Sequence, residues 1–261
     1  MEQTKDSFDY GLVSIVVPNY NYGKFIGATI ASVQSQTYTN WELIVIDDGS
    51  SDDSVKAVKE KQKDDDRIVL LSTAKNSGAA KARNLGIARA RGRYIAFLDA
   101  DDLFLPQKLQ RQVEFMKEKD AAFSFCGAEL VDEQGKSLGK SFCPKDKRYT
   151  YSNILHRNEI NCLSAMYDCQ KLGKIYMPED AIKREDYACF LNILKKCDGY
   201  GFSETLTQYR IHGGSISSNK LKMVPYQWHL YRRVEKLSWP HSLFLMGCWV
   251  FWSVWKHFLK R

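Results

Sequence analysis

Three absences limit what this sequence can encode. Its seven cysteines are an odd number with no pair at C-x-x-C spacing, so the sequence predicts neither a disulfide framework nor a zinc site. We expect them to be small apolar core residues in a reducing cytoplasm. The first residues carry no apolar signal core, which predicts that the protein is not exported. Internal repeats and low-complexity runs are also absent, which excludes solenoid and fibrous classes.

Residues 1–219 carry no excess of positive charge. The 261 residues carry 38 Lys and Arg against 31 Asp and Glu, a formal net charge of +7. Residues 220–261 hold eight of these bases and one acid, Glu235, which leaves thirty of each in residues 1–219. A neutral body of this kind argues against nucleic-acid binding. The tail also holds five of the six tryptophans, so we expect it to have a partner of its own.

Residues 12–105 alternate between the hydrophobic periods of strands and of helices. Strands and helices are predicted in turn over 12–17, 24–36, 41–46, 54–62, 67–71, 79–90 and 93–98. This order predicts a mostly parallel sheet with helices on both faces. Ligands of such sheets bind beyond the carboxyl ends of the strands, where polar segments follow at 18–22, 47–51 and 99–102. We therefore expect these three segments to meet at one site.

The pattern after Pro106 is less regular. We predict helices over 106–119 and 185–197, and strands over 121–131, 162–167 and 201–209. No linker separates this half from the first. We therefore expect one domain over residues 1–219, made of halves at about 12–105 and 106–219, and a separate helical tail over 220–261.

Two acidic segments follow predicted strands. Asp99 and Asp101 lie one residue apart after an apolar run, and carboxylates so placed can bind a hard cation such as Mg²⁺ or Mn²⁺. The alternative is a solvated acidic loop. Asp47 could accept hydrogen bonds from a nucleotide, or its loop could only supply the N-cap of the following helix.

Three further positions each allow two interpretations. Ser77-Gly78 opens a predicted helix whose N–H groups favour anions, and Arg83 could bind a phosphate or be a surface residue. Asp186 shares a helix face with the apolar residues that follow it, so it is either a general base or a carboxylate that stabilises the helix dipole. His212 precedes two glycines and could contact a ligand or be structural.

Taken together, these segments resemble glycosyltransferase family 2, inverting sugar transferases of the GT-A fold. The resemblance rests on six segments in order: 14–21, 41–50, 76–84, 94–102, 184–187 and 209–212. It implies an α/β fold, Rossmann-like with a mostly parallel central sheet and helices on both faces, followed by a C-terminal helical extension. The first half of the domain would then bind the nucleotide and the second half the acceptor.

The resemblance also implies roles for single residues. Nucleotide contacts would come from Pro18, Tyr20, Asp47, Asp48, Asn76, Arg83, Asp99 and Ala100. Pro18 and Tyr20 would frame a uracil, and Asp99 would hold the ribose. The other implied residues are Asp101 for Mn²⁺ or Mg²⁺, His212 and Ser215 near the diphosphate, Asp186 as catalytic base, and Glu185 and Asp102 on the acceptor side.

The implied reaction moves a sugar from a nucleotide-diphosphate sugar, with a UDP-sugar expected, to a hydroxyl of a glycan. The expected acceptor is linked to a polyprenyl diphosphate, as in the synthesis of bacterial surface polysaccharides. The alternative is a catalytically degenerate protein that binds only a nucleotide sugar or a partner protein. A nucleotidyltransferase is a weaker alternative, because residues 16–20 offer no Gly-rich phosphate loop.

The tail contains two predicted segments. A helix is expected over 225–238 with a break at Trp239-Pro240, and residues 243–255 are apolar except for Ser253. These thirteen residues are fewer than the ~20 that cross a bilayer as a helix, so we expect them to lie on an anionic membrane surface. The protein would then be peripheral on the cytoplasmic face of the inner membrane. The alternative is packing on the domain or on a second subunit of a homo-oligomer.

Overall fold

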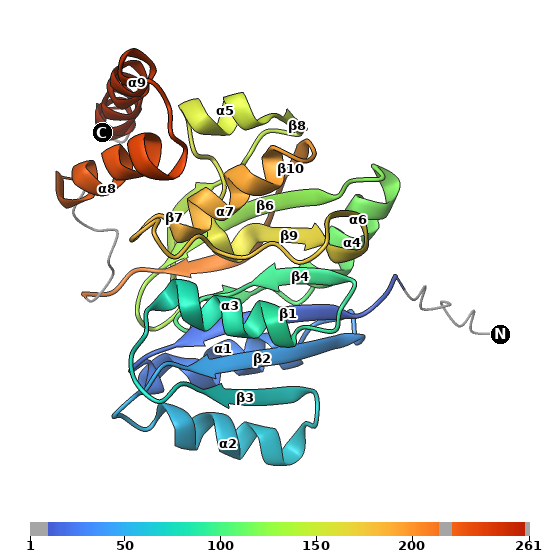
Figure 1. Ribbon diagram of the computed structural model, residues 1–261. Helices are drawn as coiled ribbons and strands as arrows, with labels where there is room; N and C mark the ends of the chain where they lie inside the picture. The colour runs from blue at the N-terminus through green and yellow to red at the C-terminus, as the bar shows by residue number, and fades with distance from the viewer. Residues whose placement is uncertain (1–9, 214–220, 259–261) are drawn as a thin grey trace.

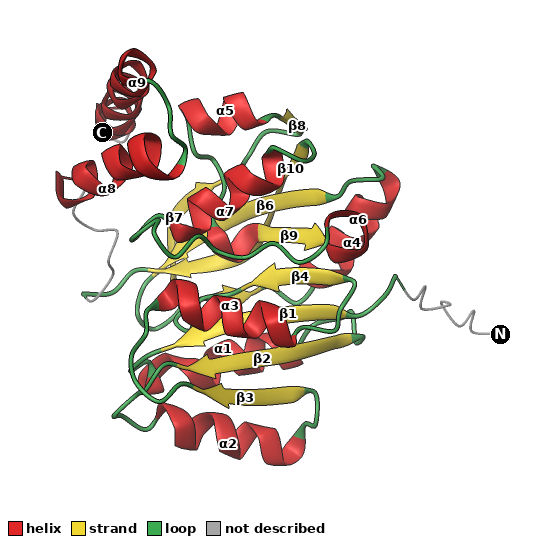
Figure 2. Ribbon diagram, in the orientation of Figure 1, coloured by secondary structure: helices red, strands yellow, loops and turns green. Residues whose placement is uncertain are grey.

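The computed structural model describes residues 10–213 and 221–258. The strands in these ranges are β1 (Val13–Asn19), β2 (Trp41–Asp47), β3 (Ile68–Ser72), β4 (Tyr94–Phe97), β5 (Leu103–Phe104), β6 (Phe123–Val131), β7 (Ser137–Phe142), β8 (Lys147–Tyr149), β9 (Ala165–Asp168) and β10 (Gly199–Arg210). They form one sheet, whose main path runs β3-β2-β1-β4-β9-β6-β10-β5 (Figure 2). β7 pairs with β6, and β8 pairs with β10.

The half of the sheet built from the first strands is parallel. β1 pairs in parallel with β2 and β4, and β2 pairs in parallel with β3. The carboxyl ends of these strands therefore lie along one edge. β9 runs antiparallel to β4 and to β6, and β10 is again parallel to β6. The predicted mostly parallel sheet is confirmed.

Helices cover both faces of the sheet, as the sequence predicts. The helices are α1 (Gly23–Gln34), α2 (Ser54–Asp64), α3 (Ala79–Arg89), α4 (Lys108–Glu118), α5 (Tyr151–His156), α6 (Cys169–Leu172), α7 (Glu185–Leu194), α8 (Val224–His229) and α9 (Trp239–Phe258). Figure 1 shows α3 and α7 on the near face and α1 on the far face. The edge where the parallel strands end is thus bordered by the first turns of helices from both layers.

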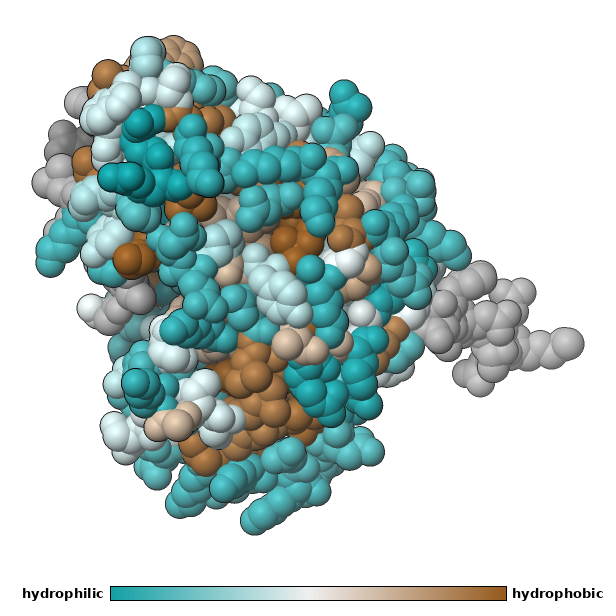
Figure 3. All heavy atoms as spheres, in the orientation of Figure 1, coloured by the Kyte–Doolittle hydropathy of each residue, from teal (hydrophilic) through white to brown (hydrophobic). Residues whose placement is uncertain are grey.

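Two hydrophobic clusters, one on each face, hold these layers together. Successive residues of a strand point to opposite faces. Val16 and Ile44 therefore pack under α3 and α7, whereas Ile15 and Leu43 pack under α1 and α4. The near face is less completely covered at β3, where Leu71 is half-buried, and Figure 3 shows a hydrophobic area on this face.

The short elements of the second half were not predicted. β5 has two residues, and five of the six residues of β7 are exposed, so neither shows an apolar alternation. The strand predicted over 162–167 is wrong in its first part, because Cys162–Ser164 forms a 3-10 turn and β9 begins only at Ala165. β8, α5 and α6 also lacked a signal, because each spans only three to six residues.

The tail packs on the near side of the sheet domain. Leu230, Tyr231 and Leu245 are buried in the same hydrophobic cluster as the residues of α7. The helix predicted over 225–238 forms only as far as Val234, as α8 and a turn of π-helix over Leu230–Val234. The break expected at Trp239-Pro240 is misplaced, because residues 235–238 form it and Trp239 and Pro240 begin α9. The predicted domain boundary near residue 219 lies outside the described residues.

The outer side of α9 is apolar. Leu243, Phe244, Val250 and Phe251 are between 47% and 60% exposed, while Leu245 is fully buried against the body. None of the helices in the described ranges combines the length and the hydropathy that a bilayer crossing requires.

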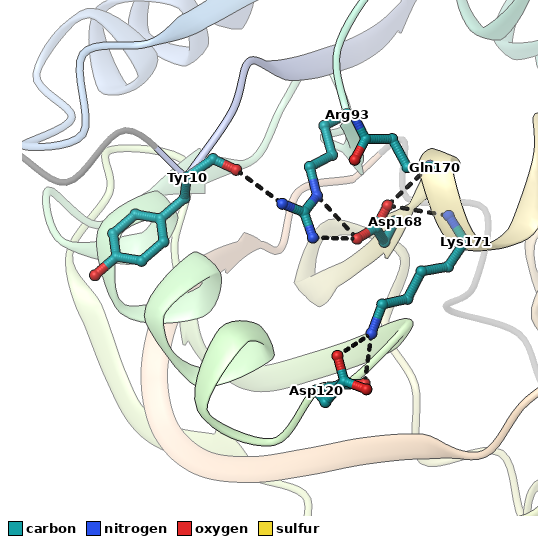
Figure 4. A network of polar contacts seen from close by, with 6 residues as sticks. All are labelled: Tyr10, Arg93, Asp120, Asp168, Gln170 and Lys171. Atoms are coloured by element: carbon teal, nitrogen blue, oxygen red, sulfur yellow. Dashed lines mark hydrogen bonds and ion pairs between the residues drawn. The ribbon is translucent and has the colours of Figure 1, made fainter.

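Arg93 and Asp168 fasten β9 to the parallel half of the sheet (Figure 4). The Arg93 Nε and Nη2 atoms donate to Asp168 Oδ2 at 3.0 and 2.9 Å. The other carboxylate oxygen accepts the backbone N–H groups of Gln170 and Lys171 at the start of α6. The Asp168 side chain is 1% exposed and that of Arg93 is 35% exposed. The buried charge of Asp168 therefore depends on Arg93.

Replacing Arg93 by Met should lower the free energy of unfolding by about 3 kcal/mol, because a buried carboxylate loses its cation. Lys119→Met removes the same charge from an exposed pair with Glu118 and should leave the free energy of unfolding almost unchanged. Urea unfolding followed by circular dichroism measures both losses. Equal losses in the two variants would contradict the role assigned to Arg93.

Candidate active site

The loops after β1 and β2 are tied together at the carboxyl edge of the sheet. The Asn19 amide donates to Asp47 Oδ1 at 2.9 Å and to the Ser50 hydroxyl at 3.2 Å. Asp47 Oδ2 accepts the backbone N–H of Ser50 at 3.1 Å, and the backbone N–H of Asn21 donates to Ser50 Oγ at 2.9 Å. Two of the three predicted polar segments therefore meet, and Asp47 is held at the point where they do.

Asp48 anchors the loop before α3. Its carboxylate accepts the hydroxyls of Thr73 and Ser77, both at 2.7 Å, and the backbone N–H groups of Ser77 and Gly78 at 3.0 and 2.7 Å. Burial acts to raise the pKa of Asp48, but these hydrogen bonds together hold it below its ordinary value. The N–H groups that the sequence suggested for an anion are bound by this side chain, which corrects that expectation. The buried Asp48 therefore supports the loop that carries Asn76.

The loop over residues 99–102 is held from two sides. Thr29 Oγ1, on α1, lies 2.8 and 2.9 Å from the carbonyl oxygens of Ala100 and Asp102. Arg210, at the end of β10, donates from Nε to the carbonyl oxygen of Asp101 at 2.7 Å and from its backbone N–H to Asp102 Oδ1 at 2.8 Å. These contacts fix the backbone of the loop, so that its other side chains have defined directions.

Asp102 lies beneath this loop. Its carboxyl is fully enclosed, and burial, with Asp101 and Asp99 adding to it, raises its pKa well above the ordinary value. The expectation that Asp102 faces the acceptor is therefore corrected, because an acceptor cannot reach a buried carboxyl.

Asp101 and His212 meet beside the loop over residues 99–102, where both side chains are largely buried. His212 Nε2 lies 2.8 Å from Asp101 Oδ2, and the His212 ring packs against Phe25 with ring centroids 5.0 Å apart. Burial and then the charge of Asp99 raise the pKa of Asp101, and the hydrogen bond to His212 acts against this rise. Burial, helped by Asp101, also raises the pKa of Tyr22 to about 12. The residue expected to bind the metal, Asp101, and a residue expected near the diphosphate, His212, are thus brought together from the segments after β4 and β10.

Arg83 joins the acidic loop to α7. Its Nη2 lies 2.5 Å from Asp99 Oδ1 and its Nη1 lies 3.3 Å from Glu185 Oε1. The guanidinium is buried, so the phosphate contact expected of it is replaced here by two carboxylates. Burial and then Asp186 raise the pKa of Glu185, while Arg83 lowers it. Asp186 is the next residue in the first turn of α7 and is partly exposed.

The remaining predicted residues differ in accessibility. Tyr20 is 44% exposed, Asn76 is exposed and Pro18 is partly buried. The side chain of Ala100 is buried, so only its backbone could touch a ligand. Ser215 lies outside the described residues.

Some supporting residues were not predicted as part of the site. Asn84 exchanges two hydrogen bonds with the backbone of Met177, at 2.9 and 2.7 Å, and so holds the segment before α7 against α3. Asn84 and Arg210 lie within the segments that carry the family resemblance, and this position could have indicated that they belong to the site. The only signal for Thr29 was a hydroxyl on the apolar face of a predicted helix.

The residues that could hold a metal are few. Across 10–213 and 221–258, no group of three or more His, Cys, Asp or Glu side chains is arranged to hold an ion. Asp101 and His212 offer a carboxylate and an imidazole side by side. Mg²⁺ and Mn²⁺ commonly use one or two protein ligands and complete their shell with water and substrate phosphates. The donor set therefore fits a cation that binds together with a diphosphate.

Comparisons with known proteins agree with this geometry. Residues 14–169 match the model of the family described as Glycosyl transferase family 2. TuaG of Bacillus subtilis (strain 168), whose name assigns it to teichuronic acid biosynthesis, is 40% identical over 251 residues, which are 96% of this chain and 97% of TuaG. WfgD of Escherichia coli, named a UDP-Glc:alpha-D-GlcNAc-diphosphoundecaprenol beta-1,3-glucosyltransferase, is 39% identical over 84% of this chain and 85% of its own length.

The fold also matches solved structures. Residues 1–349 of TarS from S. aureus, crystallised with UDP-GlcNAc, align with a TM-score of 0.67 and 20% identity over 90% of this chain and 70% of that chain. This likeness shows the same arrangement of sheet and helices. The chain belongs to glycosyltransferase family 2 and is a transferase with the GT-A fold.

Proposed function

We propose that the protein is an inverting glycosyltransferase that moves a sugar from a UDP-sugar to a hydroxyl of a polyprenyl-diphosphate-linked glycan. The observation that carries the proposal is the Arg83 bridge, which brings the first turn of α7 to the acidic loop after β4. A donor held by that loop has its reacting carbon near the start of α7. The domain over residues 1–219 would carry the reaction, and 220–261 would form a docking tail.

Asp186 is the proposed catalytic base. As the acceptor oxygen attacks the anomeric carbon, the proton of that hydroxyl passes to the carboxylate, a new C–O bond forms, and the bond from this carbon to the diphosphate breaks. Glu185 and Asp186 are both partly exposed, but the Glu185 carboxylate is paired with Arg83, whereas that of Asp186 accepts the backbone N–H of Tyr187. This difference supports a role for Asp186 in contact with substrate and a supporting role for Glu185.

Asp101 and His212 are the proposed residues for Mn²⁺ or Mg²⁺. Asp101 Oδ2 and His212 Nε2 lie 2.8 Å apart, and this pair offers a carboxylate and an imidazole to a cation. When bound, a divalent cation offsets the negative charge that grows on the leaving diphosphate. Asp101 and His212 would orient the diphosphate for that departure.

The names of relatives support the substrate classes. WfgD is named for a UDP-Glc donor and a diphosphoundecaprenol-linked acceptor, and TarS was crystallised with UDP-GlcNAc. In this chain, the exposed ring of Tyr20 lies in the segment fixed beside Asp47, and this pair offers a stacking surface and a hydrogen-bond acceptor for uracil. We infer a role in the synthesis of a bacterial surface polysaccharide such as an O-antigen or a capsule.

The tail is the proposed contact with an anionic membrane on its cytoplasmic face. Exposed apolar side chains of α9 lie close to cations: the Arg157 guanidinium is 4.4 Å from the Trp252 ring, and that of Arg232 is 4.7 Å from the Trp239 ring. The only acid of the tail, Glu235, is buried and paired. Apolar side chains beside positive charge suit the boundary between acyl chains and anionic headgroups.

Asp186→Asn should lower the turnover number by about 10²–10⁴-fold and leave the affinity for UDP unchanged, because a general base acts mainly in the transition state. Asp180→Asn, an exposed carboxylate in the preceding segment, is the matched control. The assay is UDP release from UDP-glucose with a short-chain GlcNAc-diphosphate lipid as acceptor, and calorimetry gives the affinity for UDP. Near-normal turnover in Asp186→Asn would remove it as the base.

EDTA should abolish transfer, and added Mn²⁺ should restore it. His212→Gln should raise the Mn²⁺ concentration that gives half-maximal activity by on the order of 10- to 100-fold. The substitution removes an imidazole that either contacts the metal-binding carboxylate of Asp101 or binds the metal itself. Asp66→Asn changes an exposed carboxylate after α2 and should leave that concentration unchanged. An unaltered Mn²⁺ dependence in His212→Gln would exclude this site.

Flotation with vesicles of phosphatidylcholine and phosphatidylglycerol tests the membrane contact in the full chain. The wild type should float with the vesicles, and the double variant Leu243→Glu/Phe251→Glu should not, because both side chains are exposed and each gains a negative charge. Leu138→Glu changes an exposed leucine on β7 and should float like the wild type. Equal flotation of the wild type and both variants would contradict the proposal. A double variant that loses self-association but floats like the wild type would contradict it as well.

A further inference from the structure

The tail is bound to the C-terminal end of α7 through Glu235. Its carboxylate accepts the Lys195 ammonium at 2.8 Å and the Tyr151 hydroxyl at 2.6 Å. Glu235 is the only acid in residues 220–261, and its side chain is 1% exposed. A carboxylate this deeply buried is costly unless partners compensate it. The position of the tail against Lys195, the residue that follows α7, is therefore well defined.

The tail also contacts the segment that leads into α7. His229 Nε2 lies 3.0 Å from the carbonyl oxygen of Asp180. The Lys183 ammonium lies 4.7 Å from the centroid of the Tyr226 ring. Lys183 is two residues before Glu185, so these contacts reach the start of the helix. Figure 1 shows α8 and α9 next to α5 and α7 at this end of the molecule.

A third contact reaches the first turn of α7 itself. Tyr187 follows Asp186, and its hydroxyl donates to the carbonyl oxygens of Ile154 and Leu155 at 2.9 and 3.1 Å. The hydroxyl of Tyr231, in the tail, donates to the same carbonyl of Leu155 at 3.3 Å. Both tyrosines are buried. The tail and the turn that carries Asp186 therefore share one buried anchor in α5.

We propose that the tail is a positioning element for α7, in which Glu235, Lys195 and Tyr231 act as positioning residues for the carboxylate of Asp186. α7 has ten residues and is about 15 Å long, so contacts at both ends fix its position along its axis and its rotation about it. A displacement of about 1 Å in a catalytic group can cost about 10²-fold in rate. The inference rests on the proposed role of Asp186. It adds that the segment that docks on the membrane also determines where the base lies.

Lys195→Met in the full chain tests the inference, with Lys196→Met as a matched control that removes the same charge from the next exposed residue. Hydrogen–deuterium exchange of a peptide spanning residues 180–190 should become at least about 10-fold faster in Lys195→Met and stay unchanged in Lys196→Met. The turnover number with UDP-glucose and the short-chain GlcNAc-diphosphate lipid should fall at least about 10-fold in Lys195→Met only. KM for UDP-glucose and the affinity for UDP should remain within about twofold of the wild type in both.

Lys195→Arg keeps the ion pair with Glu235 and should restore both exchange protection and turnover. Unchanged exchange in Lys195→Met would overturn the inference, and so would equal losses of turnover and UDP affinity, which indicate general loosening of the fold. The exchange measurement needs no substrate. An absence of transfer in the wild type would therefore count against the proposed function, while the exchange result would still decide whether the tail holds α7.

Discussion

Two pairs of acids, Asp99 with Asp101 and Glu185 with Asp186, come from distant parts of the chain, and one buried guanidinium, that of Arg83, joins Asp99 to Glu185. In a poorly hydrated environment like charges repel strongly, and burial raises the pKa of Asp101 and of Glu185. Arg83 binds one acid of each pair and so sets the separation between the loop after β4 and the first turn of α7. Asp99 and Asp101 still repel each other within the loop after β4, and a donor-bound metal would reduce that repulsion.

The first half of the fold could be predicted because its strands are buried on both faces. β1 and β2 are therefore nearly continuous apolar runs, and the polar segments after them mark the carboxyl edge of the sheet. The second half depends on contacts that no local pattern records. Lys108 is an example: it is fully buried, its ammonium lies 4.1 Å from the Phe104 ring, and burial lowers its pKa to about 8. A charged residue type predicts exposure, so sequence reasoning cannot place such a side chain.

The same division holds for the site. Asp47, Asp99 and Asp101 could be located because a strand end determines where they lie. Their partners could not, because Arg83 reaches Glu185 across more than one hundred residues, and spacing along the chain says nothing about that pair. The sequence predicts that the N–H groups at the start of α3 favour an external anion, but they bind the protein's own Asp48 carboxylate.

The place of β9 in the sheet has a consequence for biosynthesis. β9 lies between β4 and β6 although it follows both in the sequence. The parallel strands β1 to β4 are joined by crossovers of about twenty residues and all precede β9 in the chain, but the backbone groups along one edge of β4 stay unpaired until residues 165–168 have been made. Between residues 97 and 165, synthesis takes roughly 3 to 14 s at 5–20 residues per second. For that interval the nascent chain presents an open strand edge, so the strand order itself creates a period in which the growing protein is most exposed to mispairing and most in need of chaperones.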